Sequence, residues 1–489
     1  MAQNKILLLY TNVRLRNQKP RPPLGLMYIS AALRPEFEPV LIDFRVHPLD
    51  YKEICKLLDE SIYVGISTII GQQLVFSLEL AHFIKRLRPD IPVVFGGTFP
   101  TMAPEIVLKE NCIDIVSLGD GEDTLLELAK ALSSGKDFHG IPNIAFRLDG
   151  KVKINKGCYL RNIDSPIMPA WDLVNVDDYR EVNVLTSKGC SIGCDFCYNK
   201  VFNQRSIRLR SVENVWNEIG FLYHKHHVKH IAFVDDNFFE NKEHARQIME
   251  KFRDSGWGLT WETTCRADDL CSFSEEYLSL IRDAGCSELF VGFESASDRV
   301  LNSVHKKINN SQMIKCMEMA RKYKFIIRAL FVIGLPGETQ SELMQTLKTV
   351  DFLRAEYPDC VKIPVFGIYT PYPQLPPDPT IVGGKYMEPA TMLEWSNYHH
   401  DKANHQWLTK RQRAYLENII WIYRYYAKRS KYLHENGIED RLLYFDAFVR
   451  WKLRFFSYAP AWNYVRRKES LVYENTIKNQ HDEYERLGK

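Results

Sequence analysis

The stretch KGCSIGCDFCYNK, residues 188–200, places Cys190, Cys194 and Cys197 within eight positions, in the spacing C-x3-C-x2-C. Thiolates this close in sequence usually share a metal or a cluster. A structural zinc site normally takes four ligands in two paired knuckles, yet the sequence has no histidine between 188 and 220 and no second C-x2-C pair. Three thiolates on a cubane leave one iron open to a chelating substrate. The spacing therefore favours a catalytic iron–sulfur cluster, and a zinc-structured binding protein without enzymatic activity is the alternative.

The cysteine loop follows the first of six predicted strands. These strands are EVNVLTS, HIAFVDD, LTWETTC, ELFVGFES, IIRALFVIG and VKIPVFGIY, with helix-like stretches between them. Six strand–helix units with polar residues at the strand ends predict a (β/α)6 partial TIM barrel over residues 181–388. The active site of such a domain lies at its C-terminal rim, which is where the cysteine loop would lie.

These residues resemble the signature of the radical S-adenosylmethionine (SAM) enzymes. That superfamily shares the C-x3-C-x2-C spacing and the aromatic residue before the last cysteine, here Phe196. The resemblance implies a [4Fe–4S] cluster held by the three cysteines, with SAM chelated at the open iron. It also implies that one electron cleaves SAM to methionine and a 5′-deoxyadenosyl radical, which takes hydrogen from a substrate.

Further segments match the superfamily at the ends of the predicted strands. The resemblance makes Glu294, in VGFESAS, a candidate to accept hydrogen bonds from ribose hydroxyls or to pair with Arg266, in TTCRADD. An arginine also suits a carboxylate, and these two residues are the catalytic candidates. The expected SAM-binding residues are Phe196, Asp235, Asp236, Ser295, Ile333 and Gly334. The resemblance of FVIGLPGET to the family's fifth-strand motif implies that the backbone around Ile333 and Gly334 approaches the adenine of SAM. For each charged residue alone, a structural ion pair is the other interpretation. Tyr372, in YTPYPQLP, is a candidate for substrate contact.

Residues 1–141 predict a doubly wound, Rossmann-like α/β domain. KILLLY, PVLIDF, YVGIST, IPVVFGG and IDIVSLG read as five strands, and nearly continuous apolar strands alternating with helices are typical of a buried parallel sheet. Ligands bind outside the carboxyl ends of such strands. A nucleotide is disfavoured as the ligand, because no G-x-G-x-x-G follows the first strand.

The segments PPLGL at 22–26, FGGTFPT at 95–101 and LGDGED at 118–123 resemble the cobalamin-binding group of the radical SAM superfamily. This group includes hopanoid methylases and the anaerobic magnesium-protoporphyrin monomethyl ester cyclase, and the resemblance implies cobalamin as a cofactor. The expected cobalamin-binding residues are Leu24, Gly25, Ser67, Thr68, Gly96, Gly97, Thr98, Gly121 and Glu122. The D-x-H-x-x-G motif of other cobalamin families is absent. A Rossmann-like domain that serves only for packing is therefore the alternative.

Two further segments complete the expected domain organisation. Residues 142–180 predict a hairpin turning at Asp149-Gly150 and then a linker. Residues 389–489 form a helical, basic and aromatic C-terminal region, and residues 401–470 hold fifteen Lys and Arg against seven Asp and Glu. These helices could cap the barrel, line a pocket for a large or hydrophobic substrate, or rest on anionic membrane lipids. No nucleic-acid-binding motif is present, so no nucleic-acid partner is expected.

The composition predicts a cytoplasmic protein. The net charge is only +3 and no apolar run reaches the length of a transmembrane helix. The first residues lack the features of a signal peptide, and eleven cysteines, an odd number, fit a reducing compartment. We therefore expect an enzyme that methylates an unactivated carbon of a small or lipid-like substrate, with electrons from a donor such as flavodoxin or ferredoxin. Cobalamin-assisted oxidation or ring closure is the alternative reaction.

Overall fold

The computed structural model describes residues 4–11, 19–47, 51–157, 162–165, 167–363, 366–427, 438–457, 459–465 and 467–468, and beyond them only 471, 475 and 478. The chain forms two compact units. The first comprises Met1–Asn183, Glu388–Tyr398 and Glu469–Lys489, and the second comprises Val184–Met387 and His399–Lys468. Within the described residues, no helix is both long enough and apolar enough to cross a bilayer.

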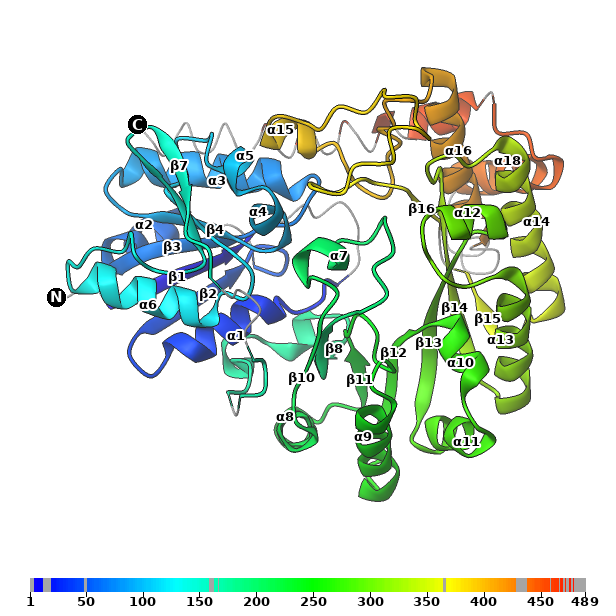
Figure 1. Cartoon of the computed structure of the whole chain (residues 1–489), viewed down its shortest axis with the longest axis horizontal. Helices are drawn as coiled ribbons and strands as arrows, with labels where there is room; N and C mark the ends of the chain where they lie inside the picture. Colours follow the sequence, from blue (N-terminus) through cyan, green and yellow to red (C-terminus); the bar gives the residue numbers. More distant parts are fainter. Residues whose placement is uncertain are drawn as a thin grey trace. The chain divides into compact units, whose positions relative to one another are not determined.

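The first unit is built on a seven-stranded sheet with the order β2-β1-β3-β4-β5-β6-β7 (Figure 1). Its parallel part consists of β1 (Lys5–Tyr10), β2 (Glu38–Asp43), β3 (Ser61–Ser67), β4 (Val93–Gly96) and β5 (Ile115–Ser117). The predicted hairpin, β6 (Ile144–Leu148) and β7 (Lys151–Ile154), extends the sheet antiparallel to β5. The order 2-1-3-4-5 belongs to the doubly wound folds, as the sequence predicts.

Helices cover both faces of this sheet. Successive side chains of β1 point to opposite sides of the sheet, so they pack into two different cores. Ile6 and Leu8 pack against α1 (Leu24–Leu33) and α6 (Glu122–Ser133). Leu7 and Leu9 belong to the core on the other face, which includes α2 (Tyr51–Glu60), α3 (Gln73–Leu87), α4 (Thr98–Met102) and α5 (Pro104–Val107). The short helix α15 (Met392–Trp395) joins this second core, and its Trp395 contacts Phe99 edge-on at 5.9 Å.

The second unit contains an open sheet with the order β15-β14-β13-β12-β11-β8, and β16 also pairs with β14. The strands are β8 (Val182–Val184), β11 (His230–Phe233), β12 (Thr260–Cys265), β13 (Cys286–Glu294), β14 (Ile326–Ile333), β15 (Val361–Lys362) and β16 (Phe366–Ile368). All pairs from β11 to β16 are parallel. β15 pairs with the start of β14 and β16 with its end, so the two occupy one strand position. These six positions match the predicted partial barrel.

Helices cover one face of this sheet, and they connect the strands in sequence order (Figure 1). They are α8 (Val212–His226), α9 (Lys242–Ser255), α10 (Ala267–Ser272), α11 (Glu275–Asp283), α12 (Asp298–Ser303), α13 (Asn310–Tyr323) and α14 (Gln340–Glu356). Beyond the sheet, α16 (Lys410–Ala427) and α18 (Ile438–Leu453) pack against each other, and Tyr423 of α16 donates a hydrogen bond to the Ile363 carbonyl at 2.9 Å. The helix α16 therefore caps the sheet, which is one of the three arrangements expected for the C-terminal helices.

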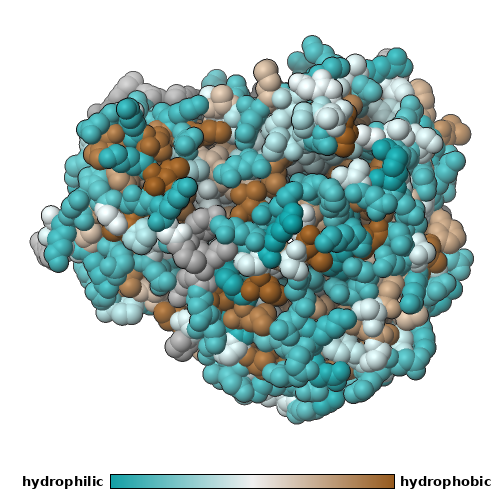
Figure 2. All heavy atoms as spheres, viewed as in Figure 1, coloured by the Kyte–Doolittle hydropathy of each residue, from teal (hydrophilic) through white to brown (hydrophobic). Residues whose placement is uncertain are grey.

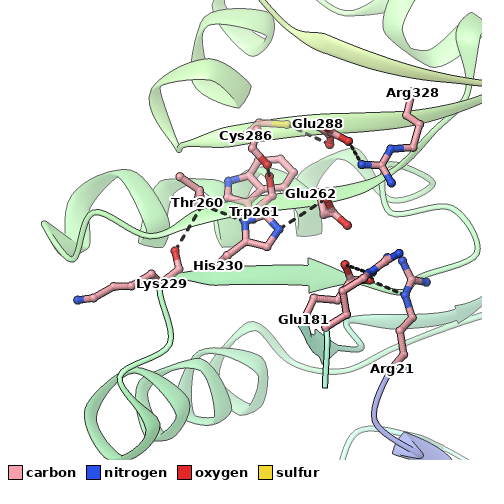
Figure 3. A network of polar contacts seen from close by, with 12 residues as sticks. Arg21, Glu181, Lys229, His230, Thr260, Trp261, Glu262, Cys286, Glu288 and Arg328 are labelled. Carbon is pink, nitrogen blue, oxygen red and sulfur yellow. Dashed lines mark hydrogen bonds and ion pairs between the residues drawn. The ribbon is translucent and has the colours of Figure 1, made fainter. Parts of the chain in front are cut away.

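The other face of the sheet carries half-buried side chains along β12, β13 and β14. Near the amino ends of the strands, Glu288 pairs with both Arg328 and Lys362, and His230 lies 3.6 Å from Glu262 (Figure 3). Phe290, Leu330 and Val332 are half-buried apolar side chains on the same two strands, and Phe290 lies opposite Arg328 in the β13–β14 register. Their alternate neighbours on β13 and β14 are fully buried beneath the helices.

Candidate active site

The three cysteines lie on a loop that hydrogen bonds hold to the segment after β11. The loop runs from β9 (Ser187–Gly189) to α7 (Asn199–Phe202) and β10 (Ile207–Leu209), and β9 and β10 pair antiparallel. Asp236, just after β11, accepts hydrogen bonds from the Gly189 N–H at 2.8 Å and the Tyr198 hydroxyl at 3.0 Å. These bonds hold the loop on both sides of the cysteines. Glu240 adds a third anchor, because it accepts hydrogen bonds from the backbone and hydroxyl of Ser191.

The surroundings of the cysteine thiols shift their pKa values upward overall. Burial raises the pKa of Cys190 to about 12 and that of Cys197 to about 11. The positive charge of Arg266 opposes this rise at Cys190, and that of Lys306 opposes it at Cys197. Burial is the larger effect, so the pKa values do not themselves favour the thiolates that iron binds. A cluster held by Cys190, Cys194 and Cys197 stays a prediction from their spacing on one loop.

Arg266 and Glu294, the two catalytic candidates, do not pair with each other. Each forms an ion pair with a different residue. Arg266 lies 2.9 Å from Asp268 in an ion pair and donates to the Lys306 carbonyl at 3.0 Å. Glu294 accepts a hydrogen bond from the Lys306 ammonium at 2.7 Å, and both side chains of this pair are about nine-tenths buried. Burial lowers the pKa of Lys306, but the charges of Glu294 and Cys194 outweigh this and raise it overall. Lys306 is thus the ionic partner of Glu294 at the end of β13.

Gly292 makes room for this ion pair. A Cβ at position 292 would lie 2.3 Å from Glu294 Oε1 and 2.9 Å from Lys306 Nζ. Glu294 itself has a positive φ of 62°, a conformation that is uncommon for a residue with a side chain. Such backbone strain tends to occur at functional sites. The end of β13 is therefore shaped to turn the Glu294 carboxylate back over the strand.

The segment after α12 is tied to the cysteine loop at consecutive positions. The Asp195 N–H donates to the Val304 carbonyl at 3.1 Å, and the His305 ring contacts the Asp195 carboxylate at 2.6 Å. The Lys306 ammonium lies 5.9 Å from the centre of the Phe196 ring. Phe196 in turn packs against a small apolar cluster of Val300, Val304, Leu335 and Tyr369. This contact network places Lys306 among the candidate site residues.

Both backbone polar groups of Gly334, at the end of β14, are already hydrogen-bonded. The Gly334 N–H donates to Glu338 at 2.7 Å, and its carbonyl accepts from His405 Nε2 at 2.9 Å. Burial raises the pKa of Glu338 to about 8 and lowers that of His405 to about 4. An adenine at Ile333 and Gly334 would therefore be held by packing, since these two backbone groups are engaged. Glu338 precedes α14, whose N-cap is Thr339.

Asp235 and Ser295 take part in internal hydrogen bonds. Asp235 is buried and accepts from the hydroxyls of Thr186 and Ser187, which joins β11 to the segment before the cysteines. Ser295 is buried, and its hydroxyl contacts Thr346 at 3.4 Å. Tyr372 lies beside Tyr198 of the cysteine loop, with ring centres 6.0 Å apart. Asp236, Arg266, Glu294, Phe196 and Gly334 thus remain the stronger candidates, with Tyr372 at their edge.

The expected cobalamin-binding residues lie at the carboxyl ends of strands in the first unit or at the starts of the following helices. Ser67 and Gly96 end β3 and β4, and Gly121 precedes α6. Gly97 has a φ of 104°, and a Cβ there would lie 2.4 Å from the Thr68 carbonyl. Leu24 and Gly25 begin α1 and Thr98 and Glu122 begin α4 and α6. Parallel strands bring these positions to one edge of the sheet.

This edge also carries two buried hydroxyl groups that could bind a polar ligand. Thr68 Oγ1 and Ser117 Oγ are buried and make no hydrogen bond within the described residues. Ser117 ends β5, and the sheet places β3, β4 and β5 side by side. Buried hydroxyls normally have a partner. A polar ligand at the strand ends would supply these two hydroxyls with hydrogen-bond partners. This edge therefore fits a large polar cofactor such as cobalamin.

Sequence reasoning missed four residues that contribute to these sites: Tyr198, Glu240, Lys306 and Ser117. Tyr198 directly follows the last cysteine, and that position is a signal that could have been used. Glu240 and Lys306 reach the cysteine loop from distant segments. Only their contacts in the folded chain reveal their part in the site.

Comparison with known proteins agrees with the fold and the cysteine loop. The family model described as the radical SAM superfamily matches residues 184–350, and the B12 binding domain model matches residues 18–129. An uncharacterized methyltransferase of Pyrococcus horikoshii is 33% identical over 362 residues, which span 72% of this chain and 76% of the relative. The anaerobic magnesium-protoporphyrin IX monomethyl ester cyclase of Synechocystis is 26% identical over 347 residues, 67% of each chain. These matches favour the radical SAM interpretation over the zinc-structured binding protein.

Two solved structures share the fold. The cobalamin-dependent SAM radical enzyme OxsB, in its apo form, has a TM-score of 0.70 at 19% identity and covers 92% of this chain and 71% of its own. The radical SAM methyltransferase TsrM from Kitasatospora setae, with cobalamin and a [4Fe–4S] cluster bound, has a TM-score of 0.62 at 20% identity and covers 75% of this chain and 72% of its own. At these identities the likeness concerns the fold.

Proposed function

Because the chain belongs to the radical SAM superfamily, among members that carry a B12 binding domain, we propose that it transfers a methyl group from SAM to an unactivated carbon of a small-molecule substrate. The observation that carries this proposal is the anchored three-cysteine loop, with the buried Glu294–Lys306 pair beside it, in a chain whose 33% identical relative is a methyltransferase.

In this proposal Cys190, Cys194 and Cys197 hold a [4Fe–4S] cluster, and the edge of the first sheet at Gly97 holds cobalamin. The cluster supplies the electron that cleaves SAM, and cobalamin supplies methyl transfer. Two electrons are needed for each methyl group, and they come from an external one-electron donor such as flavodoxin or ferredoxin.

The remaining site residues orient SAM and exclude water. Glu294 accepts hydrogen bonds from the ribose hydroxyls of SAM, and its ion pair with Lys306 fixes the position of its carboxyl group. Arg266 faces the SAM carboxylate and is stiffened by Asp268. Ile333 and Gly334 pack against the adenine, and Phe196 adds an apolar wall. These contacts fix the direction in which the 5′-deoxyadenosyl radical meets the substrate.

The half-buried side chains of Phe290, Leu330 and Val332 form the surface that receives the substrate. Apolar walls exclude water from a radical, which otherwise reacts wastefully. We therefore propose a substrate with an apolar portion beside the carbon that is methylated. Tyr372 borders this site next to Tyr198.

Product analysis tests methyl transfer. Full-length protein, reconstituted without oxygen and given a one-electron reductant, should release S-adenosylhomocysteine and 5′-deoxyadenosine in comparable amounts for each substrate consumed. Oxidation or ring closure is the second candidate, because a relative is a cyclase. That reaction would give 5′-deoxyadenosine without stoichiometric S-adenosylhomocysteine. Iron without corrinoid in the reconstituted protein would contradict both candidates but would leave SAM cleavage standing.

A further inference from the structure

The helix α18 has apolar residues on two opposite faces. One face is buried: Ala447 and Trp451 are fully covered, and the Trp451 ring lies 4.7 Å from Tyr423 and 5.2 Å from Tyr426 of α16. The Trp451 N–H also donates to Asp351 at 2.8 Å. α18 packs against α16 through this face (Figure 1).

The opposite face is a stripe of exposed apolar side chains. Leu442, Phe445 and Leu453 are 66%, 65% and 72% exposed, and Val449 between them is half-buried. At about 100° per residue these four positions fall within about 80° of one another, so they form one line along the helix. Figure 2 shows that hydrophilic residues cover most of the face drawn there, with apolar residues gathered in separate patches. An apolar stripe of this kind usually marks an interaction surface.

Positive charge lies along one edge of the stripe. From the start of α18, residues 438–468 contain seven Lys and Arg against three acidic residues, Glu439, Asp440 and Asp446. Asp446 is occupied by an ion pair with Arg450 at 2.7 Å and by the Trp462 N–H at 2.7 Å. Arg441 and Lys452 are exposed, and at about 100° per residue both border the same edge of the stripe. Further along the chain, Phe455 and Tyr464 are exposed as well, at 48% and 60%.

We propose that this α18 face, defined by Leu442, Phe445, Val449 and Leu453 with Arg441 and Lys452, docks on the surface of an anionic lipid bilayer. A helix with an exposed apolar face and flanking cations lies in the membrane interface, with its apolar side chains among the acyl chains and its cations at the headgroups. A second copy of this chain fits less well, because two such faces would bring like charges together. Nucleic acid fits less well, because the apolar side chains of the stripe do not bind phosphate groups.

Vesicle flotation tests the proposal with the full-length protein. The probes are vesicles of phosphatidylcholine alone and of phosphatidylcholine with about one third phosphatidylglycerol. We expect the protein to float with the anionic vesicles only, and to float less at about 0.5 M salt than at about 0.1 M salt. The double variant Leu442→Asp/Phe445→Asp should lower the vesicle partition coefficient at least about tenfold, and Lys452→Glu should lower it as well.

Matched controls separate docking from misfolding and from self-association. Phe352→Asp changes another exposed apolar residue, 47% exposed on α14, and should leave flotation unchanged. Circular dichroism and iron content of the α18 variants should equal those of the wild type. The proposal is overturned if the wild type does not float with anionic vesicles, or if Leu442→Asp/Phe445→Asp floats equally well. It is also overturned if that variant instead converts a dimer into a monomer in the absence of lipid.

Discussion

The buried Glu294–Lys306 pair predicts a large cost for replacing Lys306 with methionine. Nζ and Oε1 are 2.7 Å apart, and the two side chains are 11% and 9% exposed. At an effective dielectric constant of about 20, the attraction at this distance is about 6 kcal/mol. Desolvation of both charges cancels part of it, but removal of one partner leaves the other buried and unpaired. We therefore expect Lys306→Met to lower the free energy of unfolding of the second unit by about 3–5 kcal/mol.

A double-mutant cycle measures this pair. Urea unfolding of the cluster-free chain, followed by tryptophan fluorescence without oxygen, gives the midpoint of each variant, and an unchanged m-value allows comparison. Glu294→Gln should be destabilising as well, whereas the double variant Lys306→Met/Glu294→Gln should cost less than the two single costs added together. The coupling free energy should reach at least about 2 kcal/mol.

Lys362→Met is the matched control, because Lys362 also pairs with a glutamate but its side chain is 57% exposed. It should cost at most about 1 kcal/mol. Additive single costs, or equal costs for Lys306→Met and Lys362→Met, would refute the reasoning. Lys306→Arg should retain most of the stability. In the cluster-loaded protein, Lys306→Met should also lower the reduction potential, read by EPR during a redox titration, because a positive charge beside the cluster is lost.

Three further predictions concern the other anchors of the site. Because burial raises the pKa of Glu338 from its ordinary 4.5 to about 8, the stability that its protonated form contributes is complete below about pH 4.5 and is lost as the pH rises to about 8. Glu338→Gln should therefore gain stability relative to the wild type between pH 5.5 and pH 8.5 in urea titrations, and an unchanged difference would contradict this. Gly97→Ala places a Cβ against the Thr68 carbonyl and should lower bound corrinoid, measured by absorbance, at least about tenfold while leaving iron content intact. Asp236→Ala leaves two loop donors unpaired, at about 1–3 kcal/mol each, and should reduce iron retained after desalting; full retention would show that the loop needs no such anchor.

The alternation of strands and helices predicts most of the fold. The nearly continuous apolar strands indicate the buried sheet of the first unit, and the strands that end in polar residues indicate the sheet of the second unit. The cysteine spacing likewise predicts the loop at the start of the second unit. Within this fold, local patterns do not determine ionic partners. Glu294 was expected to meet ribose or Arg266, but the backbone at Glu294 is left-handed and turns the carboxylate toward Lys306. Arg266 instead pairs with Asp268, two residues further along its own chain.

Long-range packing explains what else was missed. Glu240 and Lys306 lie 49 and 110 positions along the chain from Ser191 and Phe196, the residues of the cysteine loop that they contact. No periodicity marks such residues. Asp235 was expected to bind SAM, yet its oxygens accept bonds from Thr186 and Ser187, a pairing that forms only when the segment after β8 folds beside the end of β11.

The hydrogen bond from His405 to the Gly334 carbonyl has a consequence for how this enzyme can be divided or recombined. His405 lies well past the last strand of the barrel, yet it braces the turn proposed to contact adenine. Leu416 of α16 lies against the same turn, since a Cβ on Gly334 would approach its side chain to 2.8 Å. A chain cut after β16 would lose both supports. Exchange of C-terminal regions between relatives should therefore succeed only when the β14 turn is exchanged with them, so the smallest transferable catalytic module extends through α16.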